Sequence, residues 1–165
     1  MCIRDRLQRE ADIAVRMTPP KQEQLIARRV GEVHLGFHAH PSYLQRRGTP
    51  QTLDDLAQHA LIGFDEESAF VRAARKGMTL WQREAFALRT DNDVAQLALI
   101  RAGCGIGVCQ NLLARRDPQL VRLLPDSFTL SLETWLTMHE DLRNTPRCKV
   151  TFEALLKGLQ AYMTE

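Results

Sequence analysis

Apolar residues follow two different periods along this chain, and the change of period divides it into strands and helices. Apolar residues share one parity in three stretches, which predicts strands. These stretches are 11–16, 33–39 and 130–139. Shorter apolar runs predict further strands at 61–64, 105–108 and 120–124. Helical spacing marks 42–47, 52–59, 93–102, 111–116 and 146–165. Strands that alternate with helices predict an α/β fold with a mainly parallel sheet.

The segment 89–110 contains a complete helix with its start and its stop. Thr90, Asp91 or Asn92 can cap the helix, and Gly103 can close it in a left-handed conformation. The helix is apolar nearly all round, so we expect it to pack on a sheet and against a second surface, such as a partner subunit. The N–H groups of its first turn suit an anion. A capped core helix without a ligand is the alternative interpretation of the same residues.

Composition narrows the class of protein. The chain has 165 residues, is 44% hydrophobic and carries a net charge of +2, which is ordinary for a folded domain with one full core or two small ones. Its arginine pairs are scattered, so no electrostatic footprint for nucleic acid is visible. No apolar run approaches the roughly 18 residues of a membrane helix, and no signal core opens the chain. We therefore expect a cytoplasmic protein that does not contact a membrane.

The residues that often carry chemistry form no recognised site. The cysteines lack a C-x-x-C pair, and Cys104 and Cys109 are interpreted as small buried side chains. His38 and His40 have strand spacing, which would place both rings on one face, but no carboxylate or cysteine nearby completes a metal site. G-x-S-x-G and P-loop motifs are absent. The sequence predicts no metal, no cofactor and no enzymatic activity.

Two strands are candidates for crossings between two lobes. The final helix follows a long late strand, and this order could return the chain to the lobe where it began. The candidate crossings are 33–38 and 132–139. Two lobes joined in this way bind small molecules in the cleft and close by a hinge.

Four segments resemble, in order, the effector-binding domain of LysR-type transcriptional regulators. They are ADIAVR, LIARRVGEVHLGFHAHPSYLQRRGTPQTLDDLAQHALIGFD, FALRTDNDVAQLALIRAGCGIGVCQ and LETWLTMHEDLRNTPRC. The resemblance implies a two-lobed α/β fold of the type 2 periplasmic-binding-protein class, incomplete at the N-terminus of lobe one. The domain would cover 7–165, with lobe one at about 7–37 and 134–165 and lobe two at about 38–133. Residues 1–6 fit no family position and are interpreted as foreign to the domain.

The same resemblance implies an effector site between the lobes. Seven positions match it: Arg16, Phe64, Thr90, Asp91, Asn92, His40 and Ser42. Arg16 would clamp a carboxylate bidentately, Phe64 would form an apolar wall, and the entry to the lobe-two helix would grip the ligand. Each has a structural alternative: Arg16 pairing with a surface acid, Phe64 in the core, and 90–92 acting only as a cap. The charge of Asp91 opposes an anionic ligand unless Arg16 or a backbone amide offsets it.

Family members also carry an N-terminal winged helix-turn-helix and a linker helix, which this chain lacks. The resemblance therefore implies that DNA is bound only through that missing domain. It also implies self-association through the 94–102 helix, with Val94, Leu97, Ala98 and Leu99 exposed in the absence of a partner helix. A free-standing solute-binding protein of the same two-lobed class is the alternative function. Upstream coding sequence would separate the two.

Overall fold

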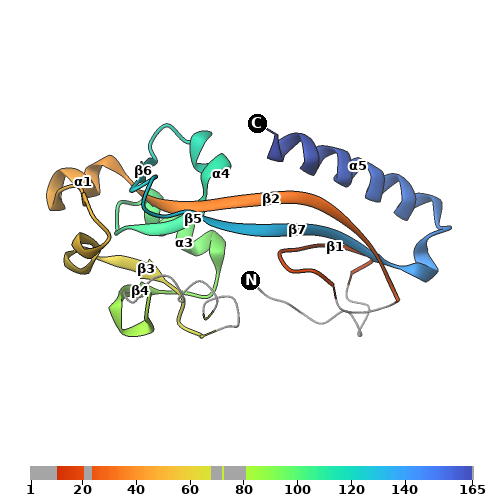
Figure 1. The fold of residues 1–165 in the computed structure, drawn as a ribbon, viewed down its shortest axis with the longest axis horizontal. Helices are drawn as coiled ribbons and strands as arrows, with labels where there is room; N and C mark the ends of the chain where they lie inside the picture. Colours follow the sequence, from red (N-terminus) through yellow and green to blue (C-terminus); the bar gives the residue numbers. More distant parts are fainter. Residues whose placement is uncertain (1–10, 21–23, 68–71, 73–80, 165) are drawn as a thin grey trace. The chain divides into compact units, whose positions relative to one another are not determined.

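The computed structural model describes residues 11–20, 24–67, 72 and 81–164, and Figure 1 shows their arrangement. The chain divides into two compact units, each of which is described on its own below. Unit 1 comprises His34–Leu130, and unit 2 comprises the chain up to Val33 together with Ser131–Glu165. Residues 1–6, which the sequence marks as foreign, lie outside the described residues.

Unit 2 is a sheet covered on one face by a long helix. β1 (Ile13–Arg16) pairs antiparallel with β7 (Leu130–His139), and β7 neighbours β2 (Leu25–Ala39). A 3-10 turn, η4 (Glu140–Leu142), leads from β7 towards α5 (Pro146–Met163), which lies along the strands in Figure 1. The core of the unit consists of Val30, Leu136, Met138 and Phe152. α5 therefore covers the face of the sheet that carries Leu136 and Met138.

In unit 1, the second part of β2 lies between two antiparallel partners. These are β5 (Gly107–Gln110) and β6 (Val121–Leu123). A separate parallel pair joins β3 (Leu61–Gly63) to β4 (Phe86–Arg89), and Leu61 bridges to Ile106. The helices are α1 (Pro41–Arg47), η2 (Asp54–Gln58), η3 (Arg83–Ala85), α3 (Asp93–Arg101) and α4 (Asn111–Arg115). Phe37, Leu56, Leu61 and Ile106 are among its fully buried side chains.

The expectation of a mainly parallel sheet is wrong for the main sheet. β1 runs against β7, and β5 and β6 run against β2, so parallel pairing is confined among the described strands to β3–β4 and the Leu61 bridge. Helices between strands favour parallel neighbours. In this sheet the order is β1, β7, β2, β5, with β6 also paired to β2. Neighbouring strands are therefore not consecutive in the chain, and a helix between consecutive strands does not set the direction of neighbours.

Most element boundaries agree with the hydrophobic pattern, and the exceptions have local causes. β2 begins at Leu25, well before 33, because its first part includes the exposed pair Arg28 and Arg29 and hides the alternation. The helix expected at 52–59 is the shorter 3-10 helix η2. Asn111 does not cap α4, because Gln110 occupies the cap position and Asn111 is buried in the first turn.

Two single side chains near helix ends depart from what their residue types favour. Thr145 stands at the cap position of α5, and Pro146 follows it, but the Thr145 side chain makes no capping hydrogen bond. Cys109 is buried as expected, whereas Cys104 is exposed, because it lies in the turn just after α3 ends.

The turn after α3 requires glycine for two separate reasons. Gly103 has φ +67°, and its N–H bonds to the carbonyl of Ile100, so it ends the helix as predicted. At Gly105, a Cβ would collide with the carbonyl oxygen of Ala60, which already accepts the N–H of Ile106. The close approach fixes the turn against the strand β3. Among the described residues, no helix is both long and apolar enough to cross a membrane.

Candidate functional site

In unit 1, backbone and carboxylate hydrogen bonds join the end of β3 to the start of α3. The N–H of Thr90 donates to the carbonyl of Gly63 at 3.0 Å. Oδ1 of Asp91 accepts the N–H groups of Asp65 and Glu66 at 3.0 and 2.9 Å. Asp91 thus holds the loop that carries Phe64. These two amides partly offset the negative charge of Asp91, which the sequence analysis expected to oppose an anionic ligand.

Asn92 is the cap of α3. Its Oδ1 accepts the N–H groups of Val94 and Ala95 at 2.9 and 3.1 Å. The capping role that the sequence left open is therefore present, and these two amides of the first turn are already occupied. Gln96 adds a buried bond from Nε2 to the carbonyl of Thr90 at 2.8 Å. The Thr90 hydroxyl oxygen also accepts the N–H of Asn92 at 3.3 Å, so several hydrogen bonds within the chain form a frame at the entry to α3.

Phe64 lies at the mouth of a small cavity of about 150 Å³ next to this frame. It is partly buried and packs against the hydrophobic core of the unit, with Trp81 and Phe86 also lining the cavity. Asp65, on the rim, pairs with Arg83 at 2.6 Å and with Arg89 at 3.6 Å. The cavity therefore has aromatic walls and a charged rim.

His40 and Ser42 form a separate cap at the start of α1. Nδ1 of His40 accepts the N–H of Ser42 at 3.1 Å, and the same nitrogen lies 2.8 Å from the Ser42 hydroxyl. A Cβ at Gly103 would lie 2.7 Å from that hydroxyl oxygen, so Ser42 is next to the C-terminal end of α3. The cap at Asn92 is at the other end of this nine-residue helix, roughly 13 Å away at 1.5 Å per residue. The structure does not bring these two groups together.

In unit 2, Arg16 is the last residue of β1 and lies directly opposite Trp135 of β7. Two threonines of β7 fix the end of β1: the Thr134 hydroxyl lies 3.2 Å from the sulfur of Met17, and that of Thr137 lies 3.3 Å from the carbonyl of Ala14. The guanidinium of Arg16 is half-buried and, within the described part of the chain, has no hydrogen bond or ion pair. Arg16 therefore pairs with no acid among the described residues.

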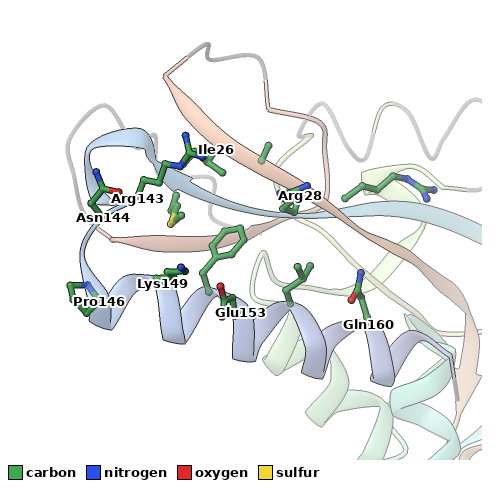
Figure 2. A pocket seen from close by; sticks show the side chains of 13 residues that line it. Ile26, Arg28, Arg143, Asn144, Pro146, Lys149, Glu153 and Gln160 are labelled. Atoms are coloured by element: carbon green, nitrogen blue, oxygen red, sulfur yellow. The ribbon is translucent and has the colours of Figure 1, made fainter.

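Unit 2 also contains an open groove of about 1030 Å³ beside α5, shown in Figure 2. Lys149, Glu153 and Gln160 line it from the helix, and Arg28 lines it from β2. None of the seven sequence-predicted residues lines this groove. Met138 does, which places the groove on the face of the sheet that α5 covers, whereas Trp135 and Arg16 leave the sheet on the opposite face.

The two histidines of the sequence motif have different surroundings and do not form a metal site together. His40 caps α1, whereas His38 is 1% exposed, and its Nδ1 lies 2.9 Å from the carbonyl oxygen of Gly36. Burial lowers the pKa of His38, so it is neutral at pH 7. The sulfur of Cys109 is 3.4 Å from the same nitrogen, and burial raises the pKa of that thiol to about 12, which makes it unreactive.

Sequence reasoning missed Trp135 and the loop contacts of Asp91. Trp135 has the same parity as the polar residues of the last strand. An aromatic ring on an otherwise polar face was the one feature of the sequence that could have marked it as a site residue. The bonds from Asp65 and Glu66 to Asp91 join residues about 25 positions apart and leave no periodic trace.

Comparison with known proteins decides the family. Residues 2–160 match the family described as the LysR substrate binding domain. The chain belongs to this family. The match covers nearly the whole chain and confirms the resemblance on which the effector-site residues were chosen.

Curated relatives of this LysR-family chain are transcriptional regulators. An uncharacterized HTH-type regulator of Haemophilus influenzae is 28% identical over 136 residues, covering 78% of this chain and 46% of the relative. The HTH-type regulator CrgA of Neisseria meningitidis is 29% identical over 122 residues, covering 72% of this chain and 40% of the relative. The chain thus spans less than half the length of the curated relatives that it matches.

Solved structures agree on the fold. The regulatory domain of CrgA from Neisseria meningitidis has a TM-score of 0.79 at 23% identity and covers 93% of this chain and 78% of that one. A variant regulatory domain of AphB from Vibrio vulnificus has a TM-score of 0.65 at 18% identity, over 91% and 80%. These neighbours confirm the predicted type 2 periplasmic-binding-like α/β fold.

Proposed function

We propose that this chain is the effector-sensing part of a LysR-type transcriptional regulator. A small-molecule effector binds to it, and this binding alters how the whole protein binds DNA and controls transcription. The whole protein contacts DNA through a separate N-terminal domain. It acts in the cytoplasm. Membership of the LysR substrate-binding family, together with relatives that are regulators, supports this function over a free-standing solute-binding protein.

One observation in unit 1 supports the position of the site. The loop with Phe64 and the entry to α3 are held together by the bonds to Asp91 and Gly63. These are the positions at which the resemblance expects an effector. In α/β sheets, ligands bind at the ends of strands and the starts of helices. We assign Phe64 as an apolar contact and the Thr90 hydroxyl as a polar one, with Asp91 and Asn92 maintaining their geometry.

Arg16 is the proposed contribution of unit 2 to the same effector. The guanidinium of Arg16 makes no hydrogen bond or ion pair with the described residues, so its donors are available to an anionic group of a ligand. His40 and Ser42 are assigned to the rim at most, because they already bond to each other and cap α1. A ligand changes the state of the regulator only if it binds one state of the protein better than another.

Self-association through α3 is the second part of the proposal. Val94 is 76% exposed and Ala98 is exposed four residues later, so these two apolar side chains share the outer side of the helix. The expected exposure of Leu97 and Leu99 is wrong, because both are partly buried against the core. Covering Val94 and Ala98 is favourable, and a second subunit is the proposed cover. Val94→Glu should shift sedimentation towards the monomer. Val150→Glu, at a 67% exposed valine of α5, is the matched control and should leave it unchanged.

A metabolite screen by thermal shift tests the proposed function. A ligand that binds only the native state raises the unfolding free energy by RT ln(1 + [L]/Kd), about 2.7 kcal/mol at a hundredfold excess over Kd. We expect at least one metabolite to stabilise the chain and to change transcription from a reporter under the intact gene product. Phe64→Ala should weaken both effects. Failure of every compound to change either quantity would contradict the proposal.

A further inference from the structure

Two side chains of the unit 2 sheet lie on the face that α5 does not cover. Arg16 and Trp135 occupy opposite positions in the antiparallel pair of β1 and β7. Directly opposite residues leave a sheet on the same face, with Cβ atoms about 5 Å apart. The two side chains are therefore neighbours although they are far apart in sequence.

Both side chains are hydrogen-bond donors without an acceptor. The indole Nε1 of Trp135 is buried from solvent and has no hydrogen-bond partner. Arg16 is half-buried, and nothing in the described part of the chain bonds to its guanidinium. Buried donors in folded proteins are nearly always paired, so two unpaired donors side by side need an explanation.

Neighbouring groups do not supply the missing acceptor. Glu133, two residues before Trp135 on the same strand, pairs with Arg29 at 3.3 Å. The hydroxyl of Thr134 is directed to the sulfur of Met17, and that of Thr137 to the carbonyl of Ala14. These contacts hold the ends of the two strands together, so the positions of Arg16 and Trp135 stay paired in the register.

We propose that Arg16 and Trp135 form a carboxylate-binding pair, in which the guanidinium and the indole N–H both donate to one anionic group of the effector. This inference rests on the proposed function and names the chemical class of its ligand. A carboxylate has lone pairs for several donors, and bonds between a guanidinium and a carboxylate are stronger than neutral ones. Trp135 adds a single directed donor, which selects the orientation of the acid.

The test uses benzoate as the probe and the indole N–H resonances as the readout. The chain has two tryptophans, so two indole signals are expected, and Trp135→Phe identifies one of them by its loss. At constant ionic strength, benzoate should move the Trp135 signal in a saturable way and leave that of Trp81 in place. Benzyl alcohol, which has the same ring without the charge, should produce no saturable shift.

Two variants measure the contribution of each donor to benzoate binding. Trp135→Phe keeps the ring and removes only the N–H, and we expect the Kd to rise about tenfold, as for the loss of one hydrogen bond. Arg16→Gln should abolish measurable binding. Arg28→Gln is the matched control, because Arg28 is an exposed arginine of the same unit that lines the groove beside α5, and its affinity should stay at the wild-type value.

The outcomes separate this inference from the proposed function. Unchanged benzoate affinity in both Trp135→Phe and Arg16→Gln would overturn the carboxylate pair, as would the absence of any saturable shift. An effector from the thermal-shift screen that lacks an anionic group would also overturn it, and the proposed function would stand. A screen without any effector would contradict the proposed function itself, whatever benzoate does.

Discussion

The two regions that carry the candidate effector residues differ in how their polar groups are used. At the entry to α3 in unit 1, the side chains of Asp91, Asn92 and Gln96 all accept or donate hydrogen bonds within the chain. At the end of β1 in unit 2, the donors of Arg16 and Trp135 have no partner among the described residues. The polar side chains of the first region make hydrogen bonds that stabilise the fold, whereas the donors of the second region are available to bind a ligand.

This difference separates the effects of mutations on stability from those on binding. Changes at the α3 entry should lower the free energy of unfolding, because they leave backbone N–H groups without an acceptor. Changes at the end of β1 should leave stability nearly unaltered and weaken the ligand. The predictions below test this separation in order of expected effect.

Asp91→Ala should have the largest effect on stability. It removes the acceptor for the N–H groups of Asp65 and Glu66, and we expect a loss of about 2 kcal/mol, reduced from the buried case because the site is exposed. Urea denaturation measures it. Asp91→Asn keeps one oxygen and should lose less. Equal stability of the wild type and the alanine variant would show that the loop is held by other contacts.

Acidification should destabilise unit 1 through His38. Burial lowers the pKa of His38 in the folded state, so the unfolded chain binds the proton more readily. The free energy of unfolding therefore keeps its whole His38 contribution above pH about 6.5, the usual pKa of histidine. It falls as the pH drops below that value. The slope for one such group is at most about 1.4 kcal/mol per pH unit. The pKa of His59 is also lowered by burial, so His59 adds its own pH dependence. The contribution of His38 is therefore the difference between wild type and His38→Gln in how the free energy of unfolding depends on pH. We expect a shallower slope in the variant between pH 6.5 and 5.5, measured by urea denaturation at each pH.

Asn92→Ala should cost about 1 kcal/mol, the usual loss for a helix cap. The Val94 and Ala95 amides lose their acceptor, so hydrogen exchange in the first turn of α3 should accelerate. Asn92→Ser restores a capping oxygen and should recover most of the loss. Slow exchange of both amides in the alanine variant would contradict the capping role.

Arg16→Gln and Trp135→Phe should lower the unfolding free energy least, by less than about 0.5 kcal/mol each, because neither removes a bond made within the described chain, and Trp135→Phe also removes a buried donor without an acceptor. Circular dichroism melts against the wild type test this. A large loss in the Arg16 variant would show that the guanidinium stabilises the fold, and the comparison between the two regions would not hold.

The sequence predicted where strands and helices begin and end better than it predicted how the strands pair. Alternation in the last strand predicted β7 with its ends at 130 and 139, because apolar residues of one parity form the face that is buried under α5. The α3 helix and its glycine stop were equally visible. Strand direction was not, because helices between strands gave no sign that the long strands β2 and β7 would lie between antiparallel neighbours.

Interactions between distant residues explain what sequence reasoning missed at the site. The family resemblance selected Arg16, Phe64 and 90–92 but could not show that Asn92 uses its oxygen to cap α3. It also could not find Trp135, whose importance depends on the register that places it opposite Arg16. Residue type and spacing predict elements well, whereas the pairing of side chains across a sheet requires the register.

The most direct test of the account is an amide and indole NMR titration of the chain with the effector found in the thermal-shift screen. We predict that the largest shifts occur at the Trp135 indole N–H and the Arg16 amide, with smaller shifts at Phe64 and Thr90 because their frame is already bonded. Shifts confined to Lys149, Glu153 and Gln160, in the groove of Figure 2, would contradict the account and move the site beside α5.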